Sequence, residues 1–135
     1  ESTRRQRQMC IRDSNNTQKE LYSMSLEQIN HNSNLIKADM SFKEFTEKSW
    51  KLPEEYYGNR YSVMVHGIGL CDEWPSIRYP TDGGDKSGRF LKNMTITVES
   101  YIGKVGGKEG VKLEQQYLVG ENGLELMSHH PLENI

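Results

Sequence analysis

The sequence has few hydrophobic residues, and this shortage limits the kinds of protein that it can form. Hydrophobic residues make up 34% of its 135 residues, which is below the usual range for a compact domain, so a missing part is to be expected. No apolar run approaches the ~20 residues that a membrane-spanning helix needs. No hydrophobic signal region follows the basic N-terminus. We therefore expect no membrane partner, and a chain with the length of one domain or of a piece of one.

The sequence also lacks an excess of either charge and has little cysteine. The formal net charge is −2 and the pI is about 6.1, which gives no electrostatic reason to expect a nucleic-acid partner. Cys10 and Cys71 lie far apart and follow no motif spacing. Two unpatterned thiols favour a reducing, cytoplasmic setting over a disulfide framework.

Residues 1–14 differ from everything that follows. They show no periodicity, contain four arginines and end abruptly. Residues 9–14 resemble the translated end of a transposon adapter, so we expect 1–14 to be a non-native leader and 15–135 to be the natural chain. The alternative is a disordered basic N-terminus.

Two helices are predicted next. The first has an apolar stripe and begins at Thr17, where Glu20 completes a capping box. Its polar residues 30–34 belong on the solvent face, with His31 exposed. A second capping box, Ser41 with Glu44, predicts a helix that Pro53 ends. The stripe of the first helix is formed by Tyr22, Leu26, Ile29 and Ile36.

Turn residues and apolar runs predict a β-rich remainder. Residues 76–85 read as a surface loop, and Glu121–Gly123 is a strong hairpin turn. The predicted strands are 61–65, 94–102, 111–119 and 124–127. Helices followed by strands indicate an α+β fold.

One histidine and two glutamates form a candidate metal site. His66 opens a glycine loop directly after the first strand, and alternation places Glu99 and Glu114 on the polar faces of their strands. The glutamates could equally be ordinary solvent-facing residues, and the histidine a packed, hydrogen-bonded side chain. The spacing alone leaves these alternatives open.

Three segments in order resemble the C-terminal half of the pita-bread metallohydrolases, the superfamily of aminopeptidase P, prolidase, methionine aminopeptidase and creatinase. They are residues 66–70 (His-Gly-Ile-Gly-Leu), 94–101 (Met-Thr-Ile-Thr-Val-Glu-Ser-Tyr) and 110–114 (Gly-Val-Lys-Leu-Glu). The resemblance runs from about residue 17 to the end, and it implies a curved antiparallel sheet with flanking helices. Residues 15–135 would then be the C-terminal portion of a pita-bread catalytic domain.

The resemblance implies that His66, Glu99 and Glu114 bind divalent metal ions, as a pair in the full-length protein. Imidazole and carboxylate ligands suit iron, manganese, cobalt or zinc. The family also uses two upstream aspartates, and no suitable pair exists here, because Asp13 lies in the leader. We therefore expect this chain to be a fragment that is itself inactive.

The loop after His66 departs from the peptidases of the superfamily. They carry a second histidine there, whereas this chain has Cys71-Asp72-Glu73-Trp74-Pro75. That form is similar to the dimethylsulfoniopropionate lyases of the superfamily, which release dimethyl sulfide and acrylate. The resemblance implies that Asp72 is the base that removes a proton α to the carboxylate, and that Tyr61 lines the substrate pocket. An aspartate that only caps the loop is the alternative, and we expect Cys71 to pack internally and Trp74 to be a pocket wall or core residue.

Three functions follow from these residues. The first is a metal-dependent lyase acting on a small sulfonium carboxylate, and the second is an Xaa-Pro aminopeptidase or dipeptidase with an altered loop. The third is a catalytically dead binding module of the same fold. The partner in the first two is a small-molecule substrate, and the resemblance also suggests a homodimer.

Overall fold

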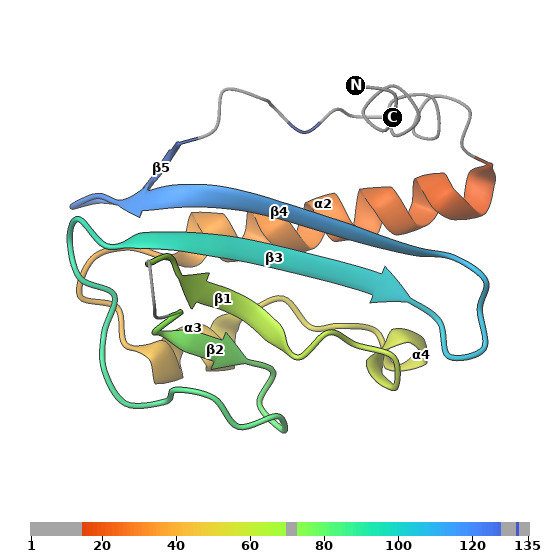
Figure 1. Cartoon of the computed structure of the whole chain (residues 1–135), viewed down its shortest axis with the longest axis horizontal. Helices are drawn as coiled ribbons and strands as arrows, with labels where there is room; N and C mark the ends of the chain where they lie inside the picture. Colours follow the sequence, from red (N-terminus) through yellow and green to blue (C-terminus); the bar gives the residue numbers. More distant parts are fainter. Residues whose placement is uncertain (1–14, 70–72, 128–131, 133–135) are drawn as a thin grey trace.

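A five-stranded antiparallel sheet forms the body of the molecule. The computed structural model describes residues 15–69, 73–127 and 132, and its strand order is β2-β1-β3-β4-β5 (Figure 1). This arrangement confirms the predicted α+β fold with an antiparallel sheet and flanking helices. The strands are β1 (Val63–Gly67), β2 (Ser76–Arg78), β3 (Thr95–Gly103), β4 (Gly110–Val119) and β5 (Leu124–Leu126).

The long helix α2 (Asn16–Leu35) crosses one face of the sheet behind β3 and β4 (Figure 1). Its N-cap is Asn15, whose side chain accepts a hydrogen bond from the backbone N–H of Gln18, while the Gln18 side chain accepts one from the Asn15 N–H. The capping box predicted at Thr17 was therefore wrong by two residues. Asparagine is a stronger N-cap than threonine, and glutamine completes a capping box as glutamate does.

The buried face of α2 is partly polar, which corrects the prediction that residues 30–34 all face solvent. Asn32 is fully buried and its side-chain oxygen accepts a hydrogen bond from the Trp50 N–H, whereas His31 is exposed, as predicted. Asn32 follows Ile29 by three residues and precedes Ile36 by four, so it lies on the apolar stripe itself. Gln28 is also fully buried and links the helix to the sheet.

Two short helices follow. In α3 (Phe42–Lys48), Ser41 caps the Glu44 N–H as predicted, but the helix ends at Lys48 and not at Pro53. Pro53 instead precedes a further short helix, α4 (Glu54–Tyr57). Proline without an N–H is well suited to a helix start, where that donor would have no partner.

β1 begins and ends two residues later than the predicted strand 61–65. It therefore includes His66 and leaves Tyr61 outside the strand. β2 replaces part of the predicted surface loop, and Ile77 within it is fully buried. A three-residue strand is too short to show a periodic pattern, which is why β2 was not predicted.

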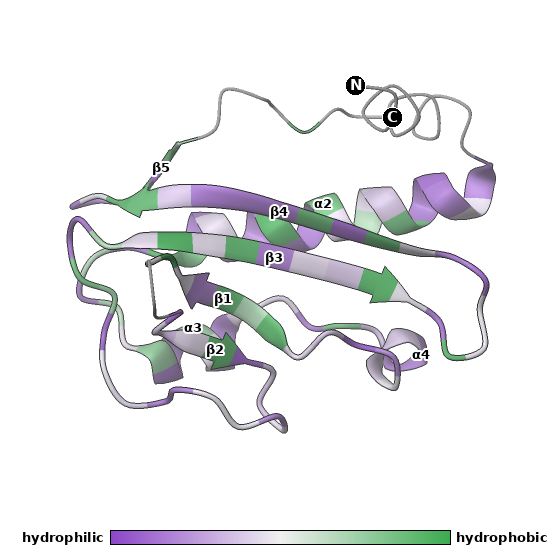
Figure 2. Ribbon diagram, viewed as in Figure 1, coloured by the Kyte–Doolittle hydropathy of each residue, from purple (hydrophilic) through white to green (hydrophobic). Residues whose placement is uncertain are grey.

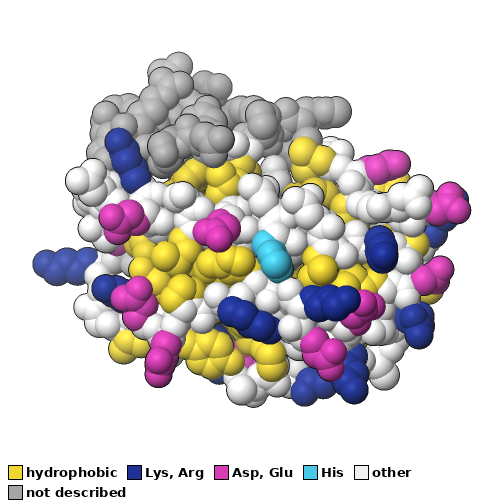
Figure 3. Space-filling model, turned by 180° about the vertical axis from the view of Figure 1, so that it is seen from behind, with side chains coloured by type: hydrophobic (Ala, Val, Ile, Leu, Met, Phe, Trp, Pro, Cys, Tyr) yellow, Lys and Arg dark blue, Asp and Glu magenta, His cyan; other side chains and the backbone are white. Residues whose placement is uncertain are grey.

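The hydrophobic core lies between the sheet and the helices. Its aromatic part is formed by Phe42, Phe45 and Phe90, whose rings meet edge to face. Hydrophobic residues gather along β1, β2 and β3, and α2 begins with hydrophilic ones (Figure 2). From behind, hydrophobic and charged side chains are mixed on the surface (Figure 3). Within the described ranges, no helix combines the length and apolar character needed to cross a membrane.

Candidate metal centre

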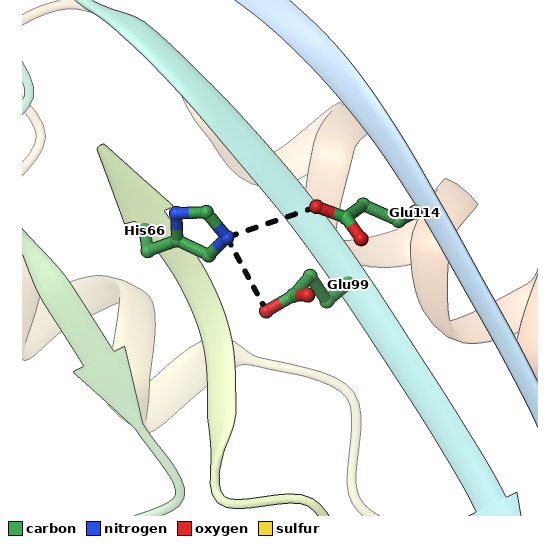
Figure 4. Close-up of side chains that lie close together, drawn as sticks. All are labelled: His66, Glu99 and Glu114. Carbon is green, nitrogen blue, oxygen red and sulfur yellow. Dashed lines mark ion pairs between the residues drawn. The ribbon is translucent and has the colours of Figure 1, made fainter. Parts of the chain in front are cut away.

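Three neighbouring strands bring His66, Glu99 and Glu114 together on one face of the sheet. His66 comes from β1, Glu99 from β3 and Glu114 from β4, and their side chains point toward one another (Figure 4). The Nε2 atom of His66 lies 3.6 Å from Oε2 of Glu99 and 3.8 Å from Oε1 of Glu114. The three residues singled out from the sequence therefore form one cluster.

Strand register explains this meeting. His66 pairs with Thr97 on β3, and Glu99 pairs directly with Glu114 on β4. Alternation turns Val98 and Ser100 toward α2, so Glu99 faces the opposite side of the sheet. Because Thr97 lies two residues from Glu99 on the same face, His66 is the diagonal neighbour of Glu99 and is within reach of both carboxylates.

His66 has a fixed orientation and tautomer. Its Nδ1 lies 2.8 Å from the carbonyl oxygen of Gly67, and a carbonyl can only accept, so Nδ1 carries the proton and donates it. When the imidazole is neutral, as a metal ligand must be, the Nε2 atom that faces the glutamates is the nitrogen with the free lone pair. Many metal-binding histidines are oriented in this way.

Glu99 is a buried carboxylate under electrostatic stress. Only 3% of its side chain is exposed, and its Oε2 atom has no hydrogen-bond partner among the described residues. Burial, and then the neighbouring Glu114 carboxylate, raise the pKa of Glu99 above its ordinary value, while Lys112 and His66 act in the opposite direction. Like charges placed directly opposite on paired strands are destabilising. The Glu99–Glu114 pair therefore does not stabilise the fold, which favours a role in binding.

The cluster fits a divalent cation. One ligand atom from each residue lies within 4.8 Å of the other two. A neutral imidazole nitrogen and two carboxylate oxygens are suitable ligands for manganese, iron, cobalt or zinc. The orphaned Oε2 of Glu99 is the atom that a metal ion at this place would satisfy.

Lys112, which was not predicted as a site residue, lies beside the three and pairs with Glu99. It lies on β4 two residues before Glu114, and its Nζ atom is 3.3 Å from Oε1 of Glu99. The same ammonium lies 4.5 Å from the ring centroid of Tyr61, the residue expected to line a substrate pocket. Tyr61 is 45% exposed and stands next to the cluster through this lysine. Alternation along β4 was the signal that could have identified it, because Lys112 shares a face with Glu114.

Hydrogen bonds beside His66 join the end of β1 to residues 73 and 75. The backbone N–H of Gly67 donates to the carbonyl oxygens of Glu73 and Pro75, and a Cβ at Gly67 would collide with the Trp74 carbonyl. Trp74, expected in a pocket wall or the core, is 49% exposed and touches Phe42 with its ring. The predicted base Asp72 and Cys71 lie outside the described residues.

Several proteins of known function are similar to this chain. It is 35% identical over 109 residues to the dimethylsulfoniopropionate lyase DddP of Roseovarius nubinhibens, which covers 79% of this chain and 24% of that protein. It is 32% identical over 127 residues to the Xaa-Pro dipeptidase of Pyrococcus furiosus, which covers 90% of this chain and 34% of that protein. The chain thus spans about a quarter to a third of the curated relatives that it matches.

Solved structures agree with the sequence relatives. The prolidase from Pyrococcus horikoshii superposes with a TM-score of 0.73 at 25% identity, over 90% of this chain and 34% of that one. The prolidase from Pyrococcus furiosus gives 0.69 at 27% identity, over 87% and 34%. These neighbours confirm the pita-bread architecture that the motifs predicted. The sequence model of metallopeptidase family M24 matches residues 4–121. The chain therefore belongs to that family.

Proposed function

We propose that this chain supplies three metal ligands of a metal-dependent lyase that acts on a small sulfonium carboxylate. The ligands are His66, Glu99 and Glu114, the base is Asp72, and Tyr61 lines the substrate pocket. The observation that carries the metal centre is the buried Oε2 of Glu99, which has no hydrogen-bond partner in the described part of the chain and lies 3.6 Å from Nε2 of His66. Identity to the curated lyases of 35% and 32% supports the choice of reaction.

The proposed reaction is a β-elimination. The Asp72 carboxylate takes the proton from the carbon α to the substrate carboxylate, the electron pair of that C–H bond forms a C=C bond, and the C–S bond breaks. Dimethyl sulfide leaves with the C–S electron pair, and acrylate is the other product. A bound divalent metal would supply Lewis-acid stabilisation of negative charge.

Two observations support this arrangement. Because Gly67 binds the Glu73 carbonyl, the residue that follows Asp72 is tied to the residue that follows His66. This supports a base close to the metal ligands. Tyr61 is exposed, and its contact with Lys112 places this proposed pocket residue beside the cluster.

An Xaa-Pro dipeptidase is the second candidate. It is supported by 32% identity over 90% of this chain and by the prolidase structures. The absence of a histidine from residues 67–75 argues against it, because the resemblance places a peptidase histidine in that loop. A cytoplasmic location, a homodimer and a non-native leader at 1–14 stay predictions from the sequence.

The full-length protein provides the test. We expect it to release dimethyl sulfide from dimethylsulfoniopropionate and to leave Xaa-Pro dipeptides intact, and we expect Asp72→Ala to lose elimination while its metal content is unchanged. Dipeptide cleavage without dimethyl sulfide would select the second candidate. Undiminished elimination by Asp72→Ala would remove Asp72 as the base.

A further inference from the structure

Lys112 makes two contacts that tie the candidate metal centre to the candidate substrate pocket. Its ammonium is 3.3 Å from Oε1 of Glu99 and 4.5 Å from the ring centroid of Tyr61. The lysine is 46% exposed, whereas Glu99 is 3% exposed, so one end of this ion pair is buried and the other reaches solvent. Lys112 belongs to β4, Glu99 to β3, and Tyr61 precedes β1.

The two oxygens of Glu99 have different surroundings. Oε1 is paired with Lys112, while Oε2 has no hydrogen-bond partner among the described residues and lies 3.6 Å from Nε2 of His66. The last torsion of a glutamate side chain is broad and roughly two-fold, so an unrestrained carboxylate would present either oxygen or both. Pairing at Oε1 selects Oε2 as the oxygen that is offered to a metal ion.

Direct attraction to a metal does not explain this lysine. An ammonium this close to a divalent cation repels it, so a purely electrostatic role would weaken metal binding. The ammonium also contacts the face of Tyr61, a cation–π contact that limits the movement of an otherwise exposed ring. Both contacts favour a role in orientation.

We propose that Lys112 is a positioning residue: it holds Oε1 of Glu99 so that Oε2 is the single ligand oxygen, and it fixes the Tyr61 ring beside the metal centre. This inference rests on the proposed metal centre. It goes further by assigning a role to a residue that does not itself bind the metal.

A double-mutant cycle in the full-length protein tests the proposal with Zn²⁺ alone as the probe. Dissociation constants are measured by calorimetry for the wild type, Glu99→Gln, Lys112→Met and the double variant. We expect Glu99→Gln to weaken Zn²⁺ binding about 10-fold more in the wild-type background than in the Lys112→Met background, within the usual coupling of interacting residues. Lys112→Arg, which retains a cation, should restore the wild-type coupling.

Lys108→Met is the matched control, because Lys108 is an exposed lysine in the turn between β3 and β4. It removes the same charge from the turn that joins the two strands and should leave the coupling unchanged. An NMR measurement follows the second contact: the ε-methylene protons of Lys112 should be shifted upfield by the ring and lose that shift in Tyr61→Leu.

Two outcomes overturn the proposal in distinguishable ways. Additive effects of Glu99→Gln and Lys112→Met on Zn²⁺ binding, in a wild type that binds Zn²⁺, would leave the metal centre intact and remove the positioning role. A wild type that binds Zn²⁺ no better than His66→Ala would remove the metal centre, and the positioning role with it.

Discussion

Glu99→Gln should make the metal-free protein more stable at neutral pH while it weakens metal binding. The carboxylate oxygens of Glu99 and Glu114 lie within 4.8 Å of each other. Two unit charges at about 4.8 Å repel by ~0.9 kcal/mol in water and by ~3.5 kcal/mol at an effective dielectric constant of 20. Glu114 is 43% exposed, so the lower figure applies more closely. The substitution also breaks the half-exposed ion pair with Lys112, which costs up to about 1 kcal/mol of stability. It removes the desolvation cost of the buried Glu99 charge as well, which adds to the gain in stability.

The pH dependence fixes the sign of this effect. The raised pKa of Glu99 means that the folded protein keeps a proton that the unfolded chain has already lost. Stability from this group is therefore full below the ordinary glutamate pKa of about 4.3 and is lost as the pH rises through the raised value. The advantage of Glu99→Gln should be near zero at about pH 4 and grow to about 1 kcal/mol above the raised pKa.

Urea unfolding in EDTA at several pH values measures this difference, with Glu125→Gln as a control at an exposed glutamate on β5. Saturating Zn²⁺ should reverse the order, because only the wild type gains full stability from binding. If Glu99→Gln destabilised the protein equally at every pH, the description of Glu99 as a stressed carboxylate would be wrong.

Three further predictions follow from the described contacts. Asn15→Ala should lower the free energy of unfolding by about 1 kcal/mol through loss of the N-cap, with Thr17→Ala as a near-neutral control in thermal melts. Gln28→Leu should cost about 1–3 kcal/mol in urea unfolding, because it removes the partner of the buried Tyr79 and Ser100 hydroxyls; a neutral result would mean that water replaces it. Metal analysis should find at most one tightly bound ion per chain, since three ligands do not complete a dinuclear centre; two tightly bound ions would contradict this.

The strands and their side-chain alternation could be predicted because β3 and β4 are long enough to show a period. β2 could not, since its single buried Ile77 gives no pattern. The polar part of the buried α2 stripe was also missed, because asparagine usually lies at the surface, and the Trp50 N–H that bonds the buried Asn32 oxygen comes from a distant segment.

Individual site residues could be predicted from the sequence, but the contacts between them could not. His66 and Glu99 were visible from their segments, whereas the burial of Glu99 depends on both neighbouring strands. Lys112 belongs to the site only because of its ion pair with Glu99 on β3 and its contact with the Tyr61 ring. Both contacts join residues far apart in the sequence. Such contacts are a property of tertiary structure.

The two hydrogen bonds of the Gly67 amide have a consequence for how such proteins diverge. They join the ends of the segment 68–73 at the residue next to His66. A segment whose ends are tied together can exchange its side chains while the strands that carry the metal ligands keep their register. We therefore expect substitutions between Gly67 and Glu73 to change the chemistry beside the metal ligands without a change of fold.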